Sequence, residues 1–114
     1  MKLTKIIQLT HAQLVAGSYE DEHELHHAFS SDLMSDVLTL DTSHILLITG
    51  LANPQLVRTA EMADIEVVLL ARNKKASPEM VQLAEEIGLV LLETPFSIFR
   101  ASGILYQNGL KAVY

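Results

Sequence analysis

A short loop between a strongly apolar run and a helical pattern offers a place for an anion to bind. Thr49 to Gln55 joins the apolar run 44–50 to a periodicity that begins at Asn53-Pro54. The first N–H groups of a helix lack partners within it, and the helix dipole favours negative charge there. We therefore expect the amides after Gly50 to be free for a ligand. The alternative is a plain strand–helix connection, since neither a GxGxxG nor a GxxxxGK[ST] pattern occurs.

Three histidines stand among acidic residues and raise the question of a metal site. His23, His26 and His27 follow or interrupt the acidic segment 20–24. On a helix, His23 and His27 would share one face and could grip a metal, whereas on a strand His26 and His27 would point to opposite faces. No HExxH motif is present, and the other two histidines lie elsewhere in the sequence. A solvated acidic turn explains the pattern more simply, so we expect no metal.

Serines and carboxylates are the remaining candidates for chemistry. A nucleophilic serine needs a base and an oxyanion hole, and nothing near Ser30, Ser31 or Ser35 identifies them. Helix capping by Ser31 or Asp32 explains that segment better. The carboxylates within 61–66 lie at a predicted helix end and strand start, where solvation accounts for them. We therefore expect no catalytic residues and no enzymatic activity.

Three successive strand–helix units must position the loop. The strands are short, continuously apolar runs at 44–50, 66–71 and 89–92, as expected when both faces are buried. An N-cap followed by proline is predicted to start each helix, because proline lacks the N–H that would be unpaired there. The three pairs are Asn53-Pro54, Ser77-Pro78 and Thr94-Pro95. Strands that alternate with helices predict an α/β fold with a mostly parallel central sheet flanked by helices on both faces.

The first forty residues give weaker signals. They predict a short helix capped by Thr4, a strand at 13–17, a second strand at 25–30, and a helix that begins at Ser31 or Asp32. We expect this second helix to turn four apolar side chains inward, Leu33, Met34, Val37 and Leu38. The last helix is expected to line one side with Phe96, Phe99, Gly103 and Tyr106.

Composition bounds the class of protein. The chain has 114 residues, of which 49% are apolar, so we expect one domain spanning residues 1–114. The net charge of −6 disfavours nucleic acid, and no apolar run reaches the roughly 20 residues of a membrane helix. There is no cysteine, hence no disulfide and no thiolate site. We expect a cytoplasmic protein without a cofactor.

The order of these segments resembles a known family. Asp32-Leu33-Met34-Ser35, the strand that ends Ile48-Thr49-Gly50, the strand 67–70 and the segment 91–96 resemble the DRTGG domain family over essentially the whole chain. The chain is also similar to the N-terminal domain of HPr kinase/phosphorylase. It departs from larger relatives after Gly50, where they carry Asp-Arg, and at Ala71-Arg72-Asn73, where they carry Thr-Gly-Gly. The resemblance implies an α/β regulatory or dimerising module without catalysis.

These observations lead to a regulatory or ligand-sensing function as the first expectation. The ligand is expected to be a nucleotide or another phosphorylated metabolite, and a partner enzyme is possible. The candidate ligand-binding residues are Thr49, Gly50, Asn53, Gln55, Asp32 and Ser35. The excess of apolar residues between 96 and 114 favours a homodimer. The alternatives are a protein interaction module without a ligand, and a small enzyme.

Overall fold

A six-stranded sheet with helices on both faces makes up the protein. The computed structural model describes all 114 residues. Its elements are, in chain order, α1 (Leu3–Thr10), β1 (Gln13–Ala16), β2 (His27–Ser30), α2 (Met34–Val37), β3 (Ile45–Thr49), α3 (Pro54–Met62), β4 (Val67–Leu70), α4 (Pro78–Ile87), β5 (Val90–Glu93), α5 (Ile98–Gln107) and β6 (Lys111–Ala112). The strand order is β1-β5-β4-β3-β2-β6, and only β1 runs antiparallel. The predicted fold class is confirmed.

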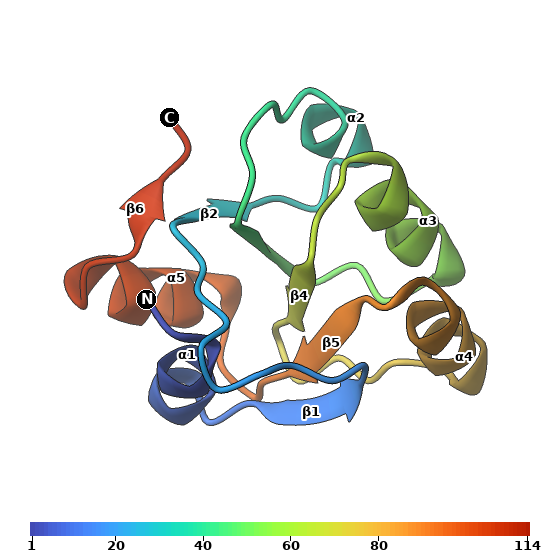
Figure 1. Ribbon diagram of the computed structural model, residues 1–114, viewed down its shortest axis with the longest axis horizontal. Helices are drawn as coiled ribbons and strands as arrows, with labels where there is room; N and C mark the ends of the chain where they lie inside the picture. Colours follow the sequence, from blue (N-terminus) through green and yellow to red (C-terminus); the bar gives the residue numbers. More distant parts are fainter.

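The helices divide between two hydrophobic layers (Figure 1). Helices α1 and α5 cover one face of the sheet, and α2, α3 and α4 cover the other. The side chains of β3 point alternately into the two layers. Leu46 and Ile48 pack toward α1 and α5, and Leu47 packs toward α3 and α4. All five residues of β3 are buried, as the continuous apolar run predicts.

Side-chain caps start the helices of the second half, and two of the three predicted caps are confirmed. Asn53 Oδ1 accepts a hydrogen bond from the Leu56 N–H at 3.0 Å, and Ser77 Oγ accepts one from Met80 at 3.2 Å. The third prediction is wrong, because α5 is capped by Ser97. The Thr94 hydroxyl instead donates to the Thr10 carbonyl at 2.6 Å and accepts from the Phe96 N–H, which holds this segment in a turn.

Helix α5 buries one face and exposes another. Ala101 and Leu105 point into the core, and Phe99, Gly103 and Tyr106 are exposed. The prediction that Phe99, Gly103 and Tyr106 line one side of the helix is confirmed, and that side is exposed, whereas Phe96 precedes the helix and is buried. Ala101 and Leu105 form the buried face, and Phe99, Gly103 and Tyr106 recur at helical spacing on another face.

The first forty residues fold less regularly than the second half. Helix α1 begins at Leu3, not at a Thr4 cap, and β2 begins only at His27. Helix α2 is a single turn without a side-chain cap, so Ser31 and Asp32 do not have the predicted role. Of the four apolar residues predicted to turn inward here, Val37 is buried and Met34 partly buried, whereas Leu33 and Leu38, which flank the helix, are exposed. None of the helices is long and apolar enough to cross a membrane.

Candidate functional site

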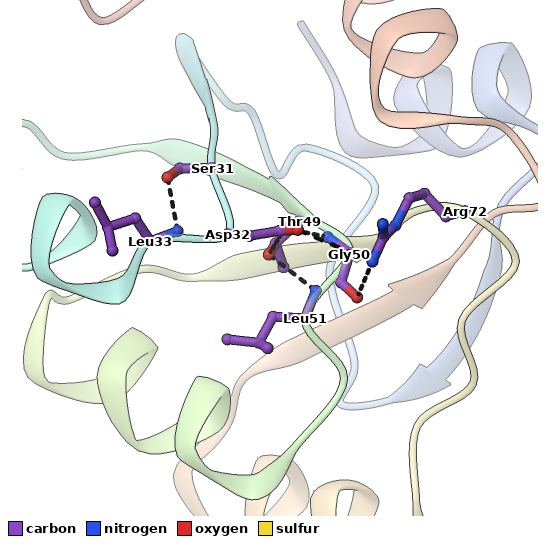
Figure 2. Close-up of polar contacts among 7 residues, drawn as sticks. All are labelled: Ser31, Asp32, Leu33, Thr49, Gly50, Leu51 and Arg72. Atoms are coloured by element: carbon purple, nitrogen blue, oxygen red, sulfur yellow. Dashed lines mark hydrogen bonds and ion pairs between the residues drawn. The ribbon is translucent and has the colours of Figure 1, made fainter.

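The carboxyl ends of β2 and β3 bring Asp32 onto the loop that sequence patterns select. The two strands run parallel with Ser30 paired to Ile48, so the residues that follow them meet at one edge of the sheet. Asp32 Oδ1 accepts hydrogen bonds from the Gly50 N–H at 2.7 Å and from the Thr49 hydroxyl at 2.8 Å (Figure 2). A carboxylate of the protein itself thus occupies the place predicted for a ligand anion.

The expectation that the amides after Gly50 are free is therefore wrong for Leu51, whereas the N–H groups of Ala52 and Asn53 have no hydrogen-bond partner. The Leu51 N–H donates to Thr49 Oγ1 at 3.2 Å, and the Gly50 N–H is held by Asp32. The cause lies in the segment after β2. Ser31 Oγ accepts from the Leu33 N–H at 2.9 Å, and this turn directs Asp32 toward β3 (Figure 2).

Arg72 completes the arrangement from the loop between β4 and α4. Its Nη2 donates to the Gly50 carbonyl at 3.3 Å and lies 3.9 Å from Asp32 Oδ2. A Cβ atom at Gly50 would lie 2.8 Å from the Arg72 guanidinium carbon, so glycine allows this approach. We call Asp32, Thr49, Gly50 and Arg72 the strand-end cluster. Half of the Arg72 side chain stays exposed, so the cation is open to solvent.

The candidate residues predicted from the sequence do not include Arg72. Arg72, Lys74 and Lys75 form a short basic cluster, which is typical of a solvated turn. A usable signal exists, because Arg72 lies just beyond the buried strand β4, the parallel neighbour of β3. Its backbone is also fixed: the N–H donates to the Phe96 carbonyl at 2.7 Å, with φ at 61°. A residue held in the left-handed region by its surroundings is a reasonable candidate for a functional position.

The cluster holds Asp32 in its charged form. Burial alone raises the pKa of Asp32, but hydrogen bonds from Gly50 and Thr49, together with the Arg72 charge, outweigh burial and leave the pKa below its ordinary value. Asp32 is therefore ionised at neutral pH, and the cluster contains one carboxylate facing one guanidinium.

A lowered pKa predicts a pH-dependent contribution of Asp32 to stability. Because the folded pKa lies below the unfolded one, this contribution is present above about pH 4 and is lost as pH falls through the folded pKa. We expect Asp32→Asn to lower the free energy of unfolding by about 1 kcal/mol at pH 7, a value reduced for the partial exposure of the side chain. Urea unfolding of both proteins at pH 7, 5 and 3 should show the gap shrinking at pH 3. A difference in the free energy of unfolding that stays constant with pH would contradict a stabilising role of ionised Asp32 in the cluster.

The other predicted site residues play lesser parts. Asn53 caps α3, as expected. Ser35 and Gln55 are exposed, and no hydrogen bond joins either of them to the strand-end cluster.

The histidines of the segment 23–27 and His44 lie at the opposite, amino-terminal ends of the parallel strands. His23 Nε2 and His44 Nδ1 approach the two oxygens of Glu66 at 3.5 and 3.4 Å. No group of three ligating side chains is arranged to hold a metal ion.

Comparisons with known proteins bear on the fold. No family model matches the chain, and no curated protein matches it. A solved structure does: the CBS and DRTGG domains of the regulatory region of Clostridium perfringens pyrophosphatase, in complex with the activator diadenosine tetraphosphate. The TM-score is 0.79 at 16% identity, over 99% of this chain and 49% of that chain. This chain thus shares a fold with a regulatory region and spans about half of its length.

Proposed function

We propose that the chain is a non-catalytic regulatory module that senses a phosphorylated ligand, a nucleotide or a phosphorylated metabolite, at the strand-end cluster. The observation that carries this proposal is the Asp32 carboxylate on the Gly50 N–H and Thr49 hydroxyl, opposite Arg72. The fold shared with a regulatory region that binds a nucleotide activator supports it, as does the resemblance to DRTGG domains.

Asp32 acts in this proposal as a resident anion that the ligand displaces. A phosphate oxygen accepts hydrogen bonds from the same N–H and hydroxyl groups, and a guanidinium binds phosphate as well as carboxylate. Arg72 swings from Asp32 to the ligand without moving the backbone, since its exposed side chain is anchored by one hydrogen bond of 3.3 Å.

Displacement of Asp32 gives the ligand a structural effect. The segment that follows leads into α2, a single turn with only Val37 fully buried. Segments with few buried contacts open at low free energy, so release of Asp32 loosens residues 31–37. A partner enzyme bound at this surface would detect the difference.

Calorimetry tests the proposal directly. Wild-type protein is titrated with ATP, ADP, AMP, diadenosine tetraphosphate and inorganic phosphate, and at least one is expected to bind. Gly50→Val pushes the Arg72 side chain away and should weaken that binding. Asn53→Ala removes the α3 cap, at about 1 kcal/mol of stability, and reports on the adjoining helix start. Binding that neither variant weakens places the ligand elsewhere.

The second candidate is an interaction module that dimerises and has no small ligand. The exposed aromatic side chains of α5 and the last residues favour it, Phe99, Tyr106 and Tyr114. Sedimentation of wild type and Phe99→Ser distinguishes the candidates. A wild-type dimer that the substitution dissociates, together with no binding in the titrations, supports the interaction module.

A further inference from the structure

A groove between β2, α5 and the end of the chain gathers most of the aromatic side chains. Its volume is about 430 Å³, within the range of small-molecule sites. Four of the six Phe and Tyr residues of the protein line it, namely Phe29, Phe99, Tyr106 and Tyr114. Phe99, Tyr106 and Tyr114 are 89%, 71% and 84% exposed, so their ring faces are available for stacking.

The groove also contains a polar pair suited to the edge of a ring. Ser30 Oγ and Ser102 Oγ lie 2.7 Å apart and satisfy each other by one hydrogen bond. A pair of hydroxyls joined in this way still offers one donor and further acceptor positions. Aromatic walls with a hydroxyl pair match a flat heteroaromatic ring, which stacks through its faces and hydrogen-bonds through its edge.

Gly103 keeps the groove open in a way that packing does not require. It lies inside α5 and lines the groove, and a Cβ placed there would meet no atom within 4 Å. Glycine inside a helix is less stable than alanine, so the fold alone would favour a larger residue. The open space is explained if a ligand occupies it.

The groove adjoins the strand-end cluster along two strands. Ser30 and Ile48 line the groove, and Asp32 and Thr49 follow them closely in the chain at the same edge of the sheet. Since side chains alternate along β3, Ile48 faces the groove and Thr49 the other side of the sheet, so one ligand must pass around the carboxyl ends of β2 and β3 to place its ring in the groove and its phosphate at the cluster. We infer that the groove binds the base of a nucleotide, an inference that rests on the proposed function and selects nucleotides over other phosphorylated metabolites.

Titrations of variants test the groove with adenosine, ADP and inorganic phosphate as probes. Gly103→Ala is expected to weaken ADP and adenosine about fivefold, leave phosphate unchanged and raise Tm by about 4 °C. Phe99→Ala should weaken ADP and adenosine without changing Tm, because the ring is exposed. Gln107→Ala, on the same helix but outside the groove, is the control.

The outcomes separate the groove from the cluster. Unchanged ADP and adenosine binding in both groove variants overturns the inference, and the proposed function survives if Arg72→Ala still weakens ADP and phosphate. ADP binding that depends on the groove but not on Arg72 or Asp32 instead overturns the proposed site. A wild-type dimer that dissociates with Phe99→Ala and does not bind adenosine assigns the groove to a second copy and overturns the inference.

Discussion

Replacing Asp32 with asparagine is expected to tighten the binding of a phosphorylated ligand about tenfold while it destabilises the free protein. The side chain of residue 32 contacts Gly50, Thr49 and Arg72, and in the proposed function the ligand displaces it from them. A neutral amide oxygen is the weaker acceptor by about 1–2 kcal/mol, which corresponds to roughly tenfold in affinity. The substitution also removes repulsion between a carboxylate and a phosphate. Calorimetry with ADP on both proteins measures the change.

The sign of this effect is its diagnostic part. A residue that contacts the ligand favourably loses affinity when substituted, whereas a competing anion gives a gain. Asp36→Asn is the matched control, because it removes one negative charge from an exposed position of α2 that no side-chain hydrogen bond joins to the cluster. Weaker ADP binding by Asp32→Asn, or an equal gain in both variants, would show that Asp32 does not occupy the phosphate position.

Replacing Arg72 with alanine is expected to weaken the same ligand about tenfold. The guanidinium is the one cation in the strand-end cluster, and a charge-assisted hydrogen bond contributes about 1.5–3 kcal/mol. We take the lower end, because the side chain is half exposed and salt screens it. The affinities of the wild-type and Arg72→Ala proteins should differ at low salt and become similar at high salt, since the lost interaction is electrostatic.

Lys74→Ala is the control for Arg72→Ala. Lys74 is exposed on the same loop, carries the same charge and makes no side-chain contact with the cluster. If the loop attracted an anion only through its general positive charge, the two variants would lose affinity for the ligand equally. That result would contradict a specific role for Arg72.

Much of the fold follows from local patterns in the second half of the chain. The strands β3, β4 and β5 are continuous apolar runs, and Asn53 and Ser77 cap the helices that they should cap. Local signals fail where tertiary contacts decide. Thr94 bonds to Thr10, far away in the sequence, and this contact delays α5. Strand β6 has two residues and depends on pairing with β2, which no local pattern reveals.

The position of the strand-end cluster can be predicted from the sequence, but the contacts within it cannot. Thr49, Gly50 and Asp32 lie together as the parallel pairing requires. The sequence predicts Asp32 both as a candidate ligand-binding residue and as a helix cap, because an acidic residue before an apolar run often has the capping role. Its true partners come from a different strand, and Arg72 comes from a third segment. Contacts between side chains of separate loops depend on loop conformation, which composition and spacing do not specify.

An NMR titration of the wild-type protein with ADP tests most directly whether a phosphate replaces the Asp32 carboxylate on the Gly50 N–H. We predict that the Gly50 amide proton and the Asp32 carboxyl carbon shift together and saturate at the same ADP concentration, since one anion replaces the other on one N–H. ADP that binds to saturation while both signals stay in place would contradict it.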